Sequence, residues 1–150
     1  MTTVADILRA KGSAEVHHVG PEDSMLEALQ RMAEYRIGAL MVLEGDRSSR
    51  IAGIVTERDY ARKIVLQGRN SATTPVREVM TAAVHCVDMA QTCEECMALM
   101  TRERIRHLPV LDDQKMLAGI VSIGDLVKAI ISEQQFTIEQ LEHYISGHRG

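Results

Sequence analysis

The sequence predicts an α/β fold built from two copies of one small unit, and an internal duplication is the main sign. Residues 51–59 read IAGIVTERD and residues 117–125 read LAGIVSIGD, so that Gly53 and Gly119 hold matching positions. Helix and strand signals recur in the same order around both stretches. Duplication at this scale indicates two copies packed together, so a site in one copy should have a counterpart in the other.

Each copy follows the order β-α-β-β-α. The first copy has a strand at 15–19, a helix from Ser24 to about Tyr35, strands at 39–43 and 51–55, and a helix from Thr56 to about Leu66. The second copy has a strand at 83–87, a helix from Thr92 to about Glu103, strands at 108–111 and 117–121, and a helix from Ser122 to about Ser132. The two copies differ mainly by a longer loop at 44–50 in the first.

The first helix of each copy carries an apolar stripe at helical spacing. The stripe residues are Met25, Ala28, Leu29 and Met32 in the first copy, and Cys93, Cys96, Met97 and Met100 in the second. Positions i, i+3, i+4 and i+7 share one helix face, so we expect these side chains to be buried. The Cys93-x-x-Cys96 pair is accordingly interpreted as core thiols, because no second pair stands at metal-ligand spacing.

All four helices begin with a hydroxyl residue and an acid three positions later. The pairs are Ser24 with Glu27, Thr56 with Asp59, Thr92 with Glu95, and Ser122 with Asp125. This spacing is typical of a capping box, for which Glu is the better acid. The shorter Asp recurs only in the second helix of each copy, which favours an additional role there.

The repeats are expected at 3–68 and 76–132, joined by a polar linker at 69–75. A short helix opens each repeat, at 4–8 and 76–80. The tail at 133–150 predicts an amphipathic helix, because Ile138, Leu141 and Ile145 are helically spaced. That helix could dock on its own chain or on a partner.

Composition narrows the class of protein. The chain has 150 residues, 45% hydrophobic but only 3% aromatic, which predicts an aliphatic core. No apolar run approaches the roughly 18 residues of a membrane span, and no signal peptide is visible. Three cysteines favour a reducing cytoplasm. A net charge of −4 argues against a nucleic-acid partner, since phosphates require a basic face.

The stretches GIVTERD at 53–59, IRHLPV at 105–110 and GIVSIGD at 119–125 resemble the CBS domain, named for cystathionine β-synthase. Two in tandem resemble a Bateman module, and the resemblance covers about residues 3–132. Such modules regulate IMP dehydrogenase and form the γ subunit of AMP-activated protein kinase. The resemblance implies two repeats related by a pseudo-two-fold axis, with adenine nucleotides held in the clefts between them.

The resemblance assigns two sets of nucleotide-binding residues. The first set is Ile54, Thr56, Arg58 and Asp59, with Val84 and His85 near the adenine and Ile105, Arg106 and His107 toward the phosphates. The second set is Ile120, Ser122 and Asp125, with Glu15, Val16, Ile37, Gly38 and Ala39. The first set is richer in cations, although Lys11 and Arg36 stand near the second in sequence.

Two interpretations remain open for Thr56 and Asp59. They could be a helix cap and nothing more. They could instead bind a nucleotide, with the hydroxyl and free N–H groups of the helix start receiving phosphate and the carboxylate accepting the ribose hydroxyls. Arg106 and His107 likewise suit phosphate, or are merely a solvated start of a strand. His17, His18 and His143 are interpreted as surface or structural residues, and Asp112–Asp113 as a turn between strands.

The function we expect is a regulatory module without catalysis that binds an adenine nucleotide and senses energy state. AMP is the favoured ligand, while ATP, NAD(H) and S-adenosylmethionine remain alternatives, as do an enzyme acting on a nucleotide or redox substrate and an adaptor without ligand. No catalytic cofactor or metal is expected. The second helices carry surplus apolar residues that indicate an interface, Ile64, Val65, Val127, Ile130 and Ile131. The resemblance implies that this interface forms a homodimer. An effector protein is also expected, because bound nucleotide should change the surface that the module presents to a partner.

Overall fold

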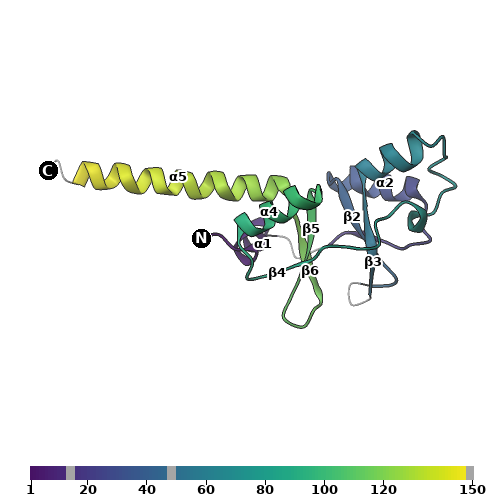
Figure 1. Ribbon diagram of the computed structural model, residues 1–150, viewed down its shortest axis with the longest axis horizontal. Helices are drawn as coiled ribbons and strands as arrows, with labels where there is room; N and C mark the ends of the chain where they lie inside the picture. Colours follow the sequence, from purple (N-terminus) through teal and green to yellow (C-terminus); the bar gives the residue numbers. More distant parts are fainter. Residues whose placement is uncertain (13–15, 47–49, 148–150) are drawn as a thin grey trace. The chain divides into compact units, whose positions relative to one another are not determined.

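The computed structural model describes residues 1–12, 16–46 and 50–147. The chain folds as two compact units. One comprises Glu15–His85, and the other comprises Met1–Ala14 together with Cys86–Gly150. The N-terminal helix therefore belongs with the second half of the sequence, which Figure 1 shows as purple α1 beside green and yellow elements.

The unit Glu15–His85 contains one three-stranded sheet with its helices. In chain order its elements are β1 (His18–Val19), α2 (Met25–Tyr35), β2 (Ala39–Leu43), β3 (Ile51–Thr56), α3 (Glu57–Tyr60), the π-helical turn η1 (Ala61–Val65) and the 3₁₀ turn η2 (Val76–Glu78). The strand order is β1-β2-β3, with β1 parallel and β3 antiparallel to β2.

The other unit repeats this arrangement. Its elements are α1 (Val4–Lys11), β4 (Val87–Asp88), α4 (Cys93–Glu103), β5 (His107–Leu111), β6 (Leu117–Ser122) and α5 (Ile123–Gly147). The sheet order is β4-β5-β6 with the same strand directions, and the register shifts at equivalent places, Val42/Leu43 and Val110/Leu111. The predicted duplication is thus confirmed down to strand register.

Most predicted elements are found within a residue or two. The stripe residues Met25, Ala28 and Met32 of α2 are buried, as are Cys93, Cys96 and Met100 of α4. The two opening strands are shorter than predicted, since β1 and β4 hold two residues each. Glu15, at the predicted start of the first strand, lies outside the described residues.

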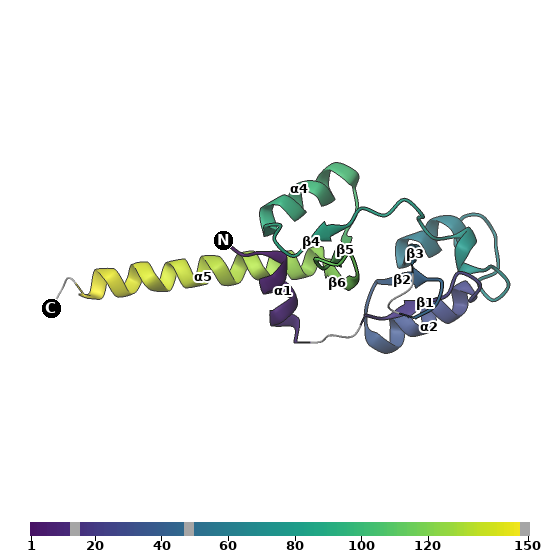
Figure 2. The same cartoon turned by 90° about the horizontal axis from the view of Figure 1, so that it is seen from below.

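The prediction of two separate C-terminal helices is wrong, because α5 is one helix of 25 residues. Figures 1 and 2 show it running well beyond the sheet of its own unit. The predicted break falls among Glu and Gln residues, which favour helix, and no Gly or Pro interrupts them. None of the helices in the described parts of the chain is both long enough and apolar enough to span a membrane.

The second helix of the first repeat is also irregular. After α3 the chain widens into a π-turn, in which the Leu66 N–H donates to the Ala61 carbonyl at 3.1 Å. This turn directs Ile64 into the core, where it is only 2% exposed, and leaves Val65 and Leu66 exposed. Ile64 was predicted to lie on the exposed apolar face, and that prediction is wrong, because the added residue in the turn changes which side chain faces inward.

Each sheet is covered by the opening segment of the other sequence repeat. Val4 and Ile7 of α1 belong to the core around β5 and β6, while Val76 and Val79 belong to the core around β2 and β3. The matching glycines of the duplicated motif permit this packing. A β-carbon on Gly119 would lie 2.9 Å from a Leu8 methyl carbon.

The equivalent contact at Gly53 is tighter. A β-carbon there would lie 2.5 Å from the Thr81 carbonyl oxygen and 2.9 Å from the Met80 sulfur. The backbone of Thr81 also exchanges two hydrogen bonds with Ile54, at 2.9 and 3.0 Å. The motif residue must therefore be glycine, because the covering backbone approaches too closely for a side chain.

The predicted linker is bound along the start of α2. The N–H groups of Met25 and Leu26 donate to the carbonyls of Thr74 and Ser71, at 2.9 and 3.0 Å. Thr74 is buried, and its hydroxyl donates to the Asn70 carbonyl at 2.8 Å. These bonds fix how the chain leaves the first repeat before it reaches η2.

Candidate functional site

The second helix of each repeat begins with a closed capping box. In one unit, the Asp59 N–H donates to the Thr56 hydroxyl at 3.1 Å, and the Thr56 N–H donates to Asp59 Oδ2 at 3.0 Å. In the other, the Asp125 N–H donates to the Ser122 hydroxyl at 3.2 Å, and the Ser122 N–H donates to Asp125 Oδ2 at 2.8 Å. Both carboxylates are mostly buried, at 15% and 18% exposed.

The expectation that Glu closes such boxes better than Asp is wrong in this chain. Ser24 and Thr92 accept N–H bonds from Glu27 and Glu95, but neither helix has the return bond that defines a closed box. Asp6 does close a box at the start of α1, although it belongs to neither predicted set. The recurrence of Asp is therefore explained by capping alone, and any binding role must be argued from its surroundings.

The start of the middle strand lies directly beside this helix start in each unit. The Glu57 N–H donates to the Gly38 carbonyl at 3.1 Å, and the equivalent Ile123 N–H donates to the Arg106 carbonyl at 2.9 Å. The first and third N–H groups of each helix are thus already bonded. Fewer N–H groups at the helix starts are therefore open to a phosphate than predicted, and side chains would have to supply most of its contacts.

The carboxylate of Asp59 has a cationic neighbour that the sequence reasoning missed. Lys63 places its Nζ 3.4 Å from Asp59 Oδ1 and also donates to the Val79 carbonyl at 2.8 Å. The signal was present in the sequence, since Asp and Lys four residues apart meet on one helix face.

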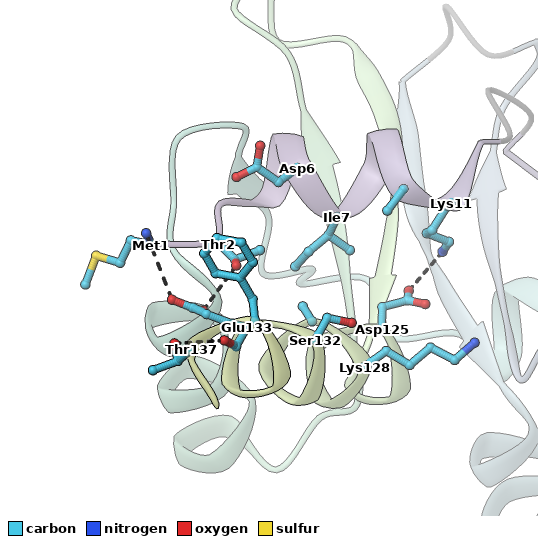
Figure 3. A pocket seen from close by; sticks show the side chains of 13 residues that line it. Met1, Thr2, Asp6, Ile7, Lys11, Asp125, Lys128, Ser132, Glu133 and Thr137 are labelled. Carbon is cyan, nitrogen blue, oxygen red and sulfur yellow. Dashed lines mark hydrogen bonds and ion pairs between the residues drawn. The ribbon is translucent and has the colours of Figure 1, made fainter. Parts of the chain in front are cut away.

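The carboxylate of Asp125 has an equivalent neighbour from a distant part of the chain. Lys11 donates from α1 to Asp125 Oδ2 at 2.9 Å (Figure 3). It also donates to the Ile120 carbonyl at 2.9 Å. Burial tends to raise the pKa of Asp125, but the hydrogen bonds from Ser122 and Lys11 outweigh it and hold the pKa below its usual value. Asp125 is therefore ionised at neutral pH and acts as a hydrogen-bond acceptor.

His107 lies in the same group of side chains, since it pairs with Ser122 across β5 and β6. Burial lowers its pKa, and the positive charges of Lys11 and Arg106 lower it further, while the Asp125 carboxylate acts in the opposite direction. The imidazole is thus neutral at neutral pH. Added negative charge beside it, such as a phosphate, would favour its protonated form.

We predict that this buried histidine makes stability fall in mild acid. The pKa of His107 in the folded chain lies below the unfolded value of about 6.5. The neutral imidazole therefore contributes fully to the free energy of unfolding above that pH. This contribution is lost as pH falls through the folded pKa, by at most about 1.4 kcal/mol per pH unit. Urea unfolding between about pH 8 and 5 should show the loss for the native chain and for the exposed control His143→Gln, but less of it for His107→Gln. Equal profiles for all three would contradict this assignment.

The remaining predicted residues divide between the units. Arg58, His85 and Arg106 are exposed, Gly38 is half-buried, and the apolar members are buried or half-buried, namely Val16, Ile37, Ala39, Ile54, Val84, Ile105 and Ile120. Each predicted set draws on both units, and the contacts given above are those within one unit. Glu15 lies outside the described residues.

The two cysteines of the C-x-x-C pair lie in the core, as predicted. The Cys93 thiol donates to the Leu126 carbonyl at 3.5 Å, and burial raises the pKa of Cys96 to about 11. The thiols stay protonated at neutral pH. Among the described residues, no three His, Cys, Asp or Glu side chains are grouped as a metal site would require. His17, expected to be a surface or structural residue, stacks on Tyr35 with ring centroids 3.6 Å apart.

Comparison with known proteins agrees with this architecture. The family model of the CBS domain matches the chain twice, at residues 4–66 and 76–132. The chain belongs to the CBS-domain family. Proteins with a pair of such domains are generally regulatory and bind nucleotides.

Solved structures and sequence relatives support the assignment. A protein with CBS domains from Burkholderia ambifaria is 55% identical, with a TM-score of 0.83 over 91% of this chain and 99% of that one. A CBS-domain protein from Agrobacterium tumefaciens is 39% identical, with a TM-score of 0.78 over 85% and 92%. The mitochondrial CBS domain-containing protein CBSX3 of Arabidopsis thaliana is 38% identical over 97% of this chain and 73% of its own length.

Proposed function

We propose that this CBS-domain protein binds an adenine nucleotide, AMP in the first instance, and acts as a sensor without catalysis. The observation that carries the proposal is the repeated group at the start of the second helix. In each unit the hydroxyl residue and the acid close a capping box, and a lysine contacts the mostly buried carboxylate. The two groups are Thr56, Asp59 and Lys63, and Ser122, Asp125 and Lys11.

The chemistry of this group suits a ribose phosphate. An ionised carboxylate has about four acceptor positions, and one backbone N–H and one lysine leave room for two ribose hydroxyls. The capping hydroxyls of Thr56 and Ser122 accept a backbone N–H, so their own O–H groups remain able to donate to phosphate. The lysines and Arg106 supply the positive charge that phosphate requires.

The contacts described above say less about the base of the nucleotide and about the length of its phosphate chain. Val84 and His85 are the residues expected near the base, in a pocket that is otherwise apolar and suits adenine. NAD(H), ATP and S-adenosylmethionine carry the same adenosine group and are the alternatives to AMP. The proposed mechanism is population shift, in which bound nucleotide favours one conformation and changes the surface offered to an effector protein.

The ligand class is tested by titration calorimetry of the purified chain with AMP, with GMP as the matched control. We expect saturable binding of AMP and weaker binding of GMP, and mass spectrometry of ligand released from the protein would identify the natural nucleotide. The absence of any adenine-nucleotide binding at millimolar concentration would overturn the proposal. Steady conversion of the bound nucleotide would show an enzyme instead of a sensor.

We also propose that the chain is a homodimer. Val65 and Leu66 after α3, and Val127 and Ile131 on α5, are exposed apolar side chains in equivalent parts of the two repeats. Exposed apolar surface of this kind usually marks an interface between proteins.

A further inference from the structure

Helix α5 carries an apolar seam along one face. The seam residues follow one another alternately four and three positions apart, and they are Val127, Ile131, Gln134, Ile138, Leu141 and Ile145. The five apolar ones are each between 43% and 59% exposed, and Gln134 is exposed too. In heptad terms Ile occupies every a position, while Val, Gln and Leu occupy the d positions. This is the pattern of a two-stranded coiled coil.

In its first turns the other faces of α5 are occupied by its own unit, whereas residues 134–147 are exposed on every face. Leu126, Ala129 and Ile130 pack against the core of that unit. Ser132, Glu133 and Phe136 line a groove of about 790 Å³ shared with α1, where the Thr2 hydroxyl donates to Glu133 at 3.1 Å (Figure 3). The seam lies on neither of these faces, and within the described part of its own unit its side chains stay exposed.

We propose that the seam pairs with the same seam of a second copy of this chain, as a parallel, in-register two-stranded coiled coil. The seam is self-complementary, because it holds no charged residue. Ile fills every a position and Leu141 fills one of the three d positions, and this combination favours two strands. This assigns the dimer contact to α5. It does not depend on nucleotide binding, so its failure would leave the nucleotide proposal untouched.

The polar residue in the seam decides the orientation. In a parallel, in-register pair Gln134 meets Gln134 of the partner copy, and the two amides can satisfy each other's hydrogen bonds. An antiparallel pair would set Gln134 against Ile138, leaving an amide buried without a partner, which is costly. The flanking positions allow the parallel pair, since Thr137 faces the partner's Glu142 and no like charges meet.

Residues 127–145 span about 27 Å at 1.5 Å per residue, fewer than three heptads. An isolated helix of this length would be marginal in water. Here the first turns of α5 are already fixed by packing on the unit's core, so the costly nucleation step is complete when the chain folds. Pairing of two copies then only has to stabilise the later turns of a helix that has already started.

The first test compares assembly of matched variants by sedimentation from about 1 to 100 µM. The native chain should be a dimer, and the seam variant Ile138→Glu/Leu141→Glu should raise the dissociation constant at least about 100-fold, because buried like charges oppose pairing. The control Gln140→Glu/His143→Glu adds the same charge off the seam and should remain dimeric. Circular dichroism should show both variants folded. A monomeric native chain, or a seam variant that remains dimeric, would overturn the proposal.

The second test addresses orientation by disulfide formation in a Cys86→Ser background. Gln134→Cys should cross-link two copies rapidly under mild oxidation, since facing d positions of a parallel pair lie within disulfide range. Glu139→Cys, off the seam on the same helix, should not. A dimer that depends on the seam but does not cross-link at position 134 would overturn the parallel register.

Discussion

Replacing Gly53 with Ala is expected to lower the free energy of unfolding by about 1–3 kcal/mol, the usual cost of overpacking a tight interior. The added methyl would meet the Thr81 carbonyl oxygen at 2.5 Å, and this oxygen is held in place by its bond from Ile54. Relief would require moving the backbone that covers β3, and with it Val76 and Val79 in the core.

The matched variant in the other repeat should cost less. The methyl of Gly119→Ala would meet the end of the flexible Leu8 side chain at 2.9 Å, which can rotate away. Gly147→Ala, with nothing within 4 Å, is a control for the substitution itself. Urea unfolding of the three variants measures which of them loses most free energy of unfolding. If Gly53→Ala were no more destabilised than Gly119→Ala, the backbone at Thr81 would move aside more easily than its hydrogen bonds with Ile54 indicate.

Removal of Asp59 or Arg106 is expected to weaken AMP binding about tenfold or more each. In the proposed site Asp59 binds the ribose and Arg106 binds the phosphate. A hydrogen bond to a charged group contributes roughly 1.5–3 kcal/mol to binding, which corresponds to about tenfold or more in affinity. Calorimetry with AMP should show both losses. Arg36→Ala, at the C-terminal cap of α2, is the matched arginine control and should have the smaller effect.

Adenosine separates the two roles, because it has the ribose but no phosphate. Its binding should be weakened by Asp59→Ala and scarcely changed by Arg106→Ala. Asp59→Ala also removes a helix cap, so its unfolding must be measured, with Asp59→Asn as the variant that keeps a capping oxygen. If both alanine variants affected adenosine and AMP alike, the assignment of ribose and phosphate would fail, and the interpretation of Thr56 and Asp59 as a cap alone would prevail.

The sequence by itself determined the repeated unit and most of its local structure. Strand periodicity, apolar stripes and hydroxyl caps are properties of neighbouring residues, so they predicted β2, β3, β5 and β6 and the starts of α2 and α4. The pairing of Ala39 with Thr56, and of His107 with Ser122, follows from adjacent strands joined by short loops. The predicted nucleotide contacts came from family resemblance and stay a prediction.

Only the tertiary structure decided which copy each opening segment covers. Leu8 and Met80 are equivalent in sequence, and either could in principle cover either glycine, yet Leu8 lies over Gly119 and Met80 over Gly53. The same choice brings Lys11 to Asp125, a pairing across 114 residues. Local signals cannot specify such contacts, because two copies of one motif offer identical partners and the path of the chain between them selects one.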